Sequence, residues 1–202
     1  MRNRRQWLLG TLSAATLLSG CSLGTVKSAP TRLDLGTPAR VAPAASPFNA
    51  LALPPFNESR PLGRDDVIWR LGADGMPNRY ATYLWRASPS ALVRERLFER
   101  LSVHGPVLTE SINAEIPQLQ VTLMEFEQVF TPDGNSNEAV VTLQAVLVKN
   151  GEVVKSFLAT ESEPGASNDA PGGAQALRVA TDRLIARLVQ WLLETMTGAV
   201  TS

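Results

Sequence analysis

Residues 139–160 read AVVTLQAVLVKNGEVVKSFLAT and carry the strongest indication of architecture in the chain. Ala139 to Val148 is nearly continuously apolar and rich in β-branched side chains, which favour strands. Asn150-Gly151 then provides the two residues that a tight hairpin turn needs at positive φ. Val153 to Thr160 resumes the strand pattern, so these residues predict two antiparallel strands joined by a hairpin.

A further strand precedes this hairpin. Leu119, Val121 and Leu123 alternate with polar residues and so share one face of a strand. Met124 and Phe126 break that alternation, which predicts either a β-bulge or a strand buried on both faces. The turn sequence at residues 132–135 connects this strand to the hairpin, so we expect three consecutive antiparallel strands.

Shorter strand patterns lie nearer the N-terminus. They cover residues 31–36, 48–53, 67–71 and 79–86. The turn sequence 72–77 separates the last two, which predicts a hairpin or two neighbouring strands. The polar, breaker-rich residues 57–66 predict a surface loop.

Two helices are predicted, and Ser88-Pro89 begins the first. Serine is a favoured N-cap, and proline fits the first helical position, where its missing N–H costs nothing. One apolar stripe follows, formed by Leu92, Val93, Leu97, Phe98 and Leu101. His104, the single histidine, lies at the end of this segment, where a C-terminal capping or dipole-complementing role is the simplest interpretation.

The second helix follows a Gly/Pro/Ser/Asn-rich segment at residues 162–173, which predicts a loop. Its apolar residues recur at heptad spacing, and Asp182 is among the polar residues expected to face away. The apolar face consists of Leu177, Thr181, Leu184, Ile185, Leu188, Trp191, Leu192 and Thr195. A stripe this short fits packing across a sheet better than a coiled-coil seam, and about 20 helical residues would span a small domain.

This order of elements predicts an α+β fold. It consists of a mixed or antiparallel sheet with two amphipathic helices packed on one face, in a single domain.

The N-terminal residues have the organisation of a secretory signal. Arg2, Arg4 and Arg5 precede an uncharged run from Trp7 to Leu18, which is too short for a permanent transmembrane helix. Leu18-Ser19-Gly20-Cys21 resembles the bacterial lipobox, in which the chain is cut between Gly20 and Cys21 and the cysteine receives a diacylglycerol and an N-acyl chain, palmitate being typical. The alternative is an ordinary signal peptide with an accidental cysteine. We therefore expect a lipoprotein signal at residues 1–20, a lipidated cysteine and tether at 21–30, and a periplasmic domain at 31–202.

The composition of the expected mature chain limits the classes of partner and the kinds of stabilising interaction that we expect. Cleavage before Cys21 leaves 16 basic and 19 acidic residues, a balance that does not indicate nucleic-acid binding. Cys21 is the only cysteine, so with its sulfur in a thioether to diacylglycerol the fold depends on a hydrophobic core rather than on disulfides. No feature of the sequence specifies an oligomeric state.

The sequence does not indicate catalysis. It has no nucleophile-elbow motif, P-loop or dinucleotide fingerprint, and a single imidazole provides neither a catalytic base with a nearby nucleophile nor a transition-metal site. The carboxylates most able to form an acid/base pair are Glu58, Asp65, Asp66, Glu125 and Glu127, and solvated loop and strand positions explain them more simply. We expect a protein that is not an enzyme, with no catalytic residue, no metal site and no cofactor beyond the acyl groups on Cys21.

The most distinctive side chains of the domain are aromatic. Trp69, Tyr80, Tyr83 and Trp85 lie within 17 positions of one another. Packing in and around the core is the simpler interpretation, because large aromatic residues dominate cores. The functional interpretation is a docking surface at Trp69, Tyr80 and Tyr83 for a protein or lipid partner, because aromatic residues also anchor interfaces.

Taken together, these segments resemble the ABC-type transport auxiliary lipoproteins, which accompany MCE-type lipid transport systems and include the paraquat-inducible group. The resemblance covers nearly all of the expected mature chain, and the junction from Trp85 to Pro89 before the first helix is its most distinctive part. The first strand departs from the family pattern, because it lacks the aromatic residue that members often carry there.

The resemblance implies a non-catalytic subunit of an ABC/MCE-type system that moves phospholipids or related lipids between envelope membranes. Its partners would be an MCE-domain protein, an ABC permease and an ATPase. It would face the periplasm from the cell outer membrane, held by its lipid anchor, and Ser22 after the cysteine agrees with outer-membrane sorting. The alternatives are a structural or assembly-factor outer-membrane lipoprotein and a lipid carrier with its own cavity.

Overall fold

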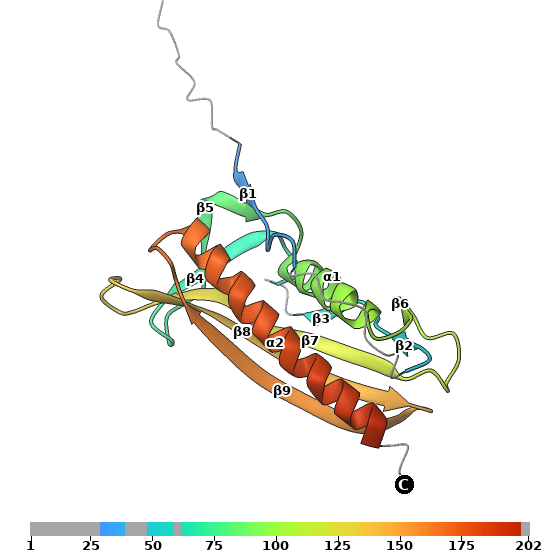
Figure 1. The fold of residues 1–202 in the computed structure, drawn as a ribbon. Coiled ribbons are helices and arrows are strands. Elements are labelled where there is room, and N and C mark those ends of the chain that lie inside the picture. The colour runs from blue at the N-terminus through green and yellow to red at the C-terminus, as the bar shows by residue number, and fades with distance from the viewer. Residues whose placement is uncertain (1–28, 39–47, 59–61, 199–202) are drawn as a thin grey trace, which may run out of the picture.

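The computed structural model describes residues 29–38, 48–58 and 62–198. They form two layers, a mixed sheet and two helices that lie together on one of its faces (Figure 1). The predicted α+β class, with both helices on one face of a single domain, is confirmed. Gly20 and Cys21 lie outside the described residues, as do the predicted signal peptide and most of the tether.

Within the described ranges, nine strands make up the sheet. Their bounds are β1 Thr31–Leu33, β2 Leu51–Ala52, β3 Asn57–Glu58, β4 Asp66–Leu71, β5 Asn78–Trp85, β6 Val107–Leu108, β7 Gln118–Phe130, β8 Asn137–Lys149 and β9 Glu152–Pro164.

Strand β7 is the centre of this sheet. Along one side it pairs with β8, which continues to β9, all antiparallel. Along its other side three shorter strands pair with it in parallel: β2 at Gln118, β3 at residues 122–123 and β4 at residues 128–130. Beyond β4 the sheet continues through antiparallel β5 to parallel β1.

The three long strands agree with the predicted hairpin and bulge. Asn150 and Gly151 have φ of 55° and 80°, as a tight hairpin turn requires. The β7–β8 register shifts between Leu123 and Glu125, so Met124 lies in a β-bulge and Phe126 returns to the buried face.

Several predicted boundaries are wrong. The apolar run 48–53 forms only the two-residue β2, and β3 occupies the start of the predicted loop 57–66. β9 continues to Pro164, through the start of the predicted loop 162–173, because Arg183 binds Glu163 and the Ser162 carbonyl and so holds this part of the strand against α2.

Helix α1, Pro89–Ser102, begins as predicted. The Ser88 side chain accepts a hydrogen bond from the Ala91 N–H, and Pro89 occupies the first turn. The apolar stripe is buried except for Phe98, which is half-buried. The sequence pattern did not reveal that Arg96 is buried as well.

Helix α2, Ala170–Gly198, has 29 residues and is longer than predicted. The Asp169 carboxylate accepts a hydrogen bond from the Gly172 N–H, as an N-cap does. A Cβ on Gly173 would lie 2.4 Å from the Gln128 side chain, so glycine lets the first turn approach β7. Because of these contacts, residues 170–173 are helical, although their glycines and proline predicted a loop.

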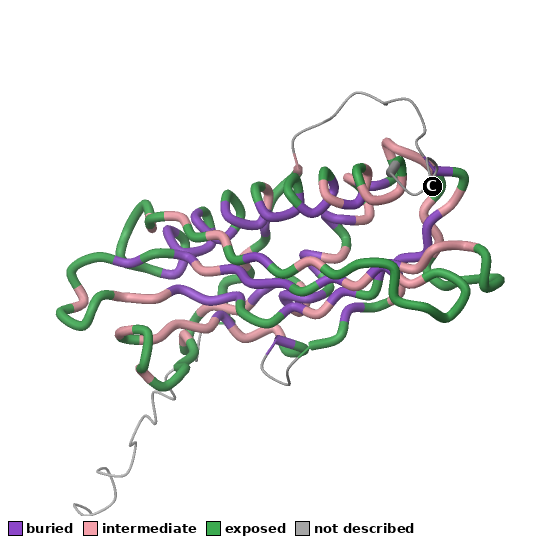
Figure 2. The backbone as a smooth tube through the Cα atoms, turned by 90° about the horizontal axis from the view of Figure 1, so that it is seen from below, coloured by how far each residue is buried: buried purple, intermediate pink, exposed green. Residues whose placement is uncertain are grey.

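The core lies between the helices and the sheet, and buried residues follow this layer in Figure 2. Leu184, Leu188 and Leu192 of α2 are fully buried there, which confirms packing across a sheet instead of a coiled-coil seam. Asp182 was expected to face away, but it binds the buried Arg96 of α1 and so connects the two helices.

Candidate functional site

The three predicted docking residues belong to one aromatic row. Trp69 of β4 packs edge-on against Phe130 of β7, with ring centroids 5.8 Å apart. The Trp69 ring is 6.1 Å from that of Tyr80, and the Tyr80 ring is 6.0 Å from that of Tyr83. These separations lie in the favourable range for aromatic pairs. The structure therefore brings Trp69, Tyr80 and Tyr83 together across the β4–β5 end of the sheet.

Each of these three side chains is half-buried. Tyr80 and Tyr83 pack on the edge of the core while leaving part of each ring accessible. Trp85 lies two residues after Tyr83 in β5. It is by contrast fully buried and packs edge-on against Phe126, with ring centroids 5.5 Å apart. The row therefore fits both interpretations given for these residues, since its rings pack on the core and also leave surface accessible. Docking of a partner on that accessible surface stays a prediction.

A buried amide network anchors the aromatic row to the start of α2. The Tyr80 hydroxyl donates to the Gln128 side-chain oxygen at 2.8 Å, and the Gln128 amide donates to Asn137 at 2.7 Å. The same Gln128 amide donates to the Asp169 carbonyl, and Asn137 donates to the Asn168 side chain. Burial, with a smaller contribution from the charge of Asp169, raises the pKa of Tyr80 to about 12.

Gln128 and Asn137 were missed by sequence reasoning. Their signal lies in the alternation: after the bulge, Phe126 and Gln128 share the inward face of β7, and Asn137 precedes the inward Ala139 on β8. A polar amide at an inward strand position needs hydrogen-bond partners, which marks it as part of a buried network.

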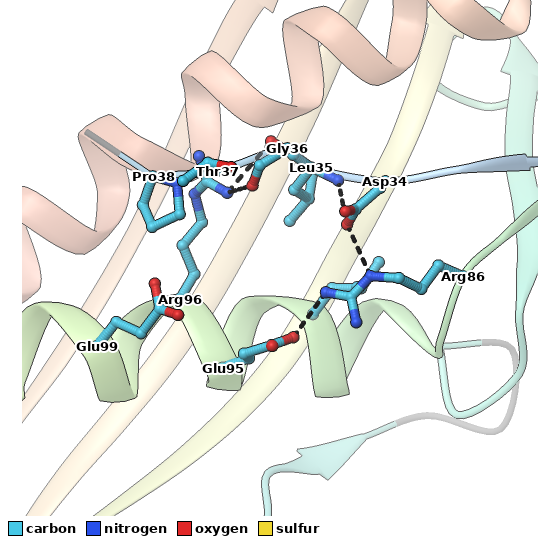
Figure 3. A pocket seen from close by; sticks show the side chains of 10 residues that line it. Asp34, Leu35, Gly36, Thr37, Pro38, Arg86, Glu95, Arg96 and Glu99 are labelled. Atoms are coloured by element: carbon cyan, nitrogen blue, oxygen red, sulfur yellow. Dashed lines mark hydrogen bonds and ion pairs between the residues drawn. The ribbon is translucent and has the colours of Figure 1, made fainter. Parts of the chain in front are cut away.

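A second group of side chains holds the segment after β1 against the helices (Figure 3). The buried Arg96 guanidinium donates to the carbonyls of Leu35 and Gly36, and it pairs with Asp182 at 2.5 Å. Arg86 binds Asp34 at 3.1 Å and Glu95 of α1 at 2.7 Å. Arg178 of α2 donates to the Thr37 carbonyl. We call residues 34–37 the arginine-held segment.

A small pocket of about 230 Å³ lies between the arginine-held segment and α1 (Figure 3). Its charged lining comes from Asp34, Arg86, Glu95, Arg96 and Glu99. Sites for drug-sized ligands usually occupy about 300–1,000 Å³ and are mostly apolar, so this pocket does not suit an acyl chain.

Most of the carboxylates considered for acid/base chemistry have structural partners. Asp65 pairs with Arg32, whose hydrogen bond lowers the pKa of Asp65 below its usual value, and Asp66 pairs with Arg64. Glu125 accepts a hydrogen bond from Thr142. Glu58 is exposed, as expected.

Glu127 does not lie at a solvated position. Its side chain is only 8% exposed and pairs with Arg70 at 2.6 Å. Arg70 is held in turn by the carbonyls of the β4–β5 turn, so the pair ties that turn to β7.

His104 follows the C-terminus of α1, where its backbone N–H donates to the Leu101 carbonyl at 2.9 Å. Burial, and then the nearby Arg100, lower the pKa of His104, which disfavours the charged imidazole at this helix end. Of the two roles expected from the sequence, capping or complementing the helix dipole, the geometry therefore favours capping, through the backbone N–H.

Metal and membrane-spanning features can be assessed for the described residues alone. These ranges contain no group of three or more His, Cys, Asp or Glu side chains arranged to hold a metal ion. In the same part of the chain, no helix has both the length and the hydropathy that crossing a membrane requires.

Comparison with known proteins gives relatives by sequence and by fold. No family model matches the chain. Protein bll6063 of Bradyrhizobium diazoefficiens, itself uncharacterized, is 28% identical over 183 residues, covering 87% of this chain and 49% of that protein. The chain thus spans about half the length of this curated relative.

Among solved structures, protein XCC0632 from Xanthomonas campestris, of the DUF330 family, superposes with a TM-score of 0.72 at 20% identity, over 85% of this chain and 100% of that one. This chain has the fold of XCC0632. The hypothetical protein CT253 from Chlamydia trachomatis is more distant, with a TM-score of 0.51 at 12% identity over 74% of this chain and 98% of that one.

Proposed function

We propose that the chain is a non-catalytic, lipid-anchored periplasmic subunit of an ABC/MCE-type system that moves phospholipids or related lipids between envelope membranes. It acts from the outer membrane, anchored through Cys21, and contacts an MCE-domain protein whose ABC permease and ATPase are separate chains. The lipobox-like sequence, the resemblance of the mature chain to the auxiliary lipoproteins and the aromatic row support this proposal.

One observation carries the docking part of the proposal: the aromatic row lies beside the point where the tether enters the domain. β1 pairs in parallel with β5, and its register places Thr31 opposite Tyr83. Because the predicted tether ends at Pro30, a subunit anchored through Cys21 presents Tyr83, and with it the row, close to its own membrane. A partner in the same envelope complex would meet accessible aromatic surface there, of the kind that anchors interfaces.

The pocket beside the arginine-held segment does not support the lipid-carrier alternative. It is small and lined by charges, whereas a carrier needs an apolar cavity that covers acyl chains. The assembly-factor alternative uses the same aromatic row with a different partner, so the identity of the co-purifying protein distinguishes it.

Trp69→Ala in the full chain tests the proposal, with Trp191→Ala as the matched control. Trp191 of α2 is also half-buried, but it packs against Phe157 of β9, away from the row. We expect Trp69→Ala to shift the melting temperature by only a few degrees yet to weaken co-purification with the MCE-domain protein, because it removes accessible ring surface and no hydrogen bond of the network. Tyr80→Ala is unsuitable, since it would leave the side-chain oxygen of the buried Gln128 without its donor.

The control should retain co-purification. Unfolding of Trp69→Ala at the growth temperature, or unchanged recovery of the MCE-domain protein with a folded variant, would contradict docking through the row. Purified protein that retains phospholipid while binding no MCE-domain protein would favour the carrier alternative.

A further inference from the structure

β9 is a long edge strand with an unusual amount of apolar surface. It has 13 residues and, within the described ranges, pairs with β8 alone. Val153, Val154 and Leu158 of this strand are exposed to 67%, 45% and 65%. Long apolar edges invite pairing with another strand, and soluble proteins normally shorten or cover them.

Two contacts show which backbone groups of β9 are free to pair. The Gly165 N–H donates to the Asn137 carbonyl, so by alternation the odd-numbered residues 157–163 direct their backbone groups toward β8. The Ser162 carbonyl accepts from Arg183 of α2 instead, which agrees with an outward direction for the even-numbered residues. Ser156, Leu158 and Thr160 therefore present their N–H and C=O groups to the edge.

We propose that a second copy of this chain pairs with β9, antiparallel, about a two-fold axis at Leu158. Two-fold symmetry requires identical strands to run antiparallel and makes every contact occur twice. In this register, Leu158 faces Leu158 of the second copy, and Ser156 faces Thr160. All three positions have outward backbone groups, so the ladder forms without rearrangement of β9.

The charges of β9 favour this occupant and this register. Lys155 and Glu161 lie three residues on either side of Leu158, so each lysine stands opposite the glutamate of the other copy, a carboxylate that Arg183 and Arg187 of its own α2 also bind. Opposite charges at facing positions stabilise a strand pair, whereas like charges destabilise it. An axis at Ser162 would place Glu161 against Glu163, and an axis at Ala159 would place the exposed Leu158 against Thr160. The sequence of β9 is thus complementary to itself about Leu158.

Cross-linking of the full chain tests the pairing. Leu158→Cys places two thiols beside the axis, and a short bismaleimide should join them into a covalent dimer. Ile112→Cys is the matched control, because Ile112 is equally accessible, at 74% exposed, but lies in the loop after β6. The parent chain controls for Cys21, its only cysteine. Dimer from Leu158→Cys alone supports the proposal, whereas no dimer, or equal dimer from Ile112→Cys, overturns it.

A charge substitution provides a measurement without cross-linking. Leu158→Lys brings two ammonium groups together at the axis, so the dissociation constant of the dimer, from sedimentation of the full chain in detergent, should rise about tenfold or more. Ile112→Lys should leave it unchanged. A parent chain that stays monomeric at every concentration, or a Leu158→Lys dimer as tight as the parent's, overturns the proposal. Neither measurement depends on an MCE-type partner, so self-pairing and the proposed function can fail separately.

Discussion

Tyr80 takes part in both the aromatic row and the buried amide network. Its ring belongs to the aromatic row, and its hydroxyl donates to the buried Gln128. Removing the phenolic proton would place a charge in a half-buried site near Asp169, which is why burial raises the pKa of Tyr80 to about 12.

A spectrophotometric titration checks this, because the chain has two tyrosines. We expect one ionisation near pH 12 that Tyr80→Phe abolishes and Tyr83→Phe retains. Since the pKa of Tyr80 is higher in the folded state than its ordinary value of 10, its contribution to the free energy of unfolding is complete below pH 10 and is lost as the pH rises toward 12. If Tyr83→Phe instead removes the ionisation near pH 12, the raised pKa belongs to Tyr83 and the assignment to Tyr80 is wrong.

Trp85 gives the second prediction at this scale. It is fully buried against Phe126, so Trp85→Ala should lower the free energy of unfolding by about 3–5 kcal/mol, as truncation of a large core aromatic usually does. Chemical denaturation measures the change. The half-buried Trp191 is the control, and a smaller loss is expected for Trp191→Ala. Equal losses for the two variants would mean that Trp85 is not a principal core residue.

Single residues were predictable where a local rule governs them. The Ser88 cap, the Asn150-Gly151 turn and the inward leucines follow from neighbouring sequence. The partners of Arg96, Gln128 and Glu127 lie 86, 9 and 57 positions away in the chain. Polar side chains that are buried by distant partners have no local signal beyond an inward position, so the sequence pattern placed Glu127 in solvent and passed over Arg96.

At the scale of elements, the β8–β9 hairpin gives the clearest test. Gly151 has φ of 80°, a conformation that β-branched residues rarely adopt, whereas asparagine tolerates it. Gly151→Val should therefore lower the free energy of unfolding by about 1–3 kcal/mol, and Gly151→Asn should cost much less. Thermal melts of the two variants check this. Equal melting temperatures would show that the turn does not need positive φ at this position.

Gly165 is not a neutral control for that experiment, although its place in a predicted loop suggested one. A Cβ there would lie 1.8 Å from the Asn137 side-chain oxygen, so substitution disturbs the amide network. This case shows why the boundaries of β9 and α2 were hard to predict: the glycines at positions 165, 172 and 173 resemble a flexible loop in sequence but permit close packing in the fold. By contrast, the long strands and both helices follow from hydrophobic periodicity, which needs no knowledge of distant contacts.

At the scale of the whole molecule, the lipid anchor is the first property to test. Cys21→Ser should abolish acylation, so the product should remain unprocessed or be released from the outer membrane, because no acyl chain would hold it there. Membrane fractionation with labelled fatty acid measures both effects, and Ser22→Ala is a control that should keep the label. An outer-membrane Cys21→Ser product, together with a parent that incorporates no label, would refute lipidation.

The α+β class and the arrangement of the two helices could be predicted for the whole molecule, because the order of strands and helices restricts the ways in which apolar faces can be buried. The parallel pairing of β1, β2, β3 and β4 with their neighbours was not predicted. Parallel neighbours are distant in sequence, and strands of two or three residues carry too little periodicity to reveal their register.

The arginine-held segment has a consequence for local concentration. Because Arg96 and Arg86 fix residues 34–36 to the helices, these residues do not lengthen the tether, which ends at Pro30. Nine residues from Ser22 to Pro30 reach at most about 30 Å. An anchored domain is therefore confined to a hemisphere of that radius around its anchor. One molecule in this volume has an effective concentration on the order of 10 mM for a binding site beside the anchor. An aromatic interface with a Kd of only about 1 mM would then be mostly occupied, yet it would separate quickly enough for partners to exchange.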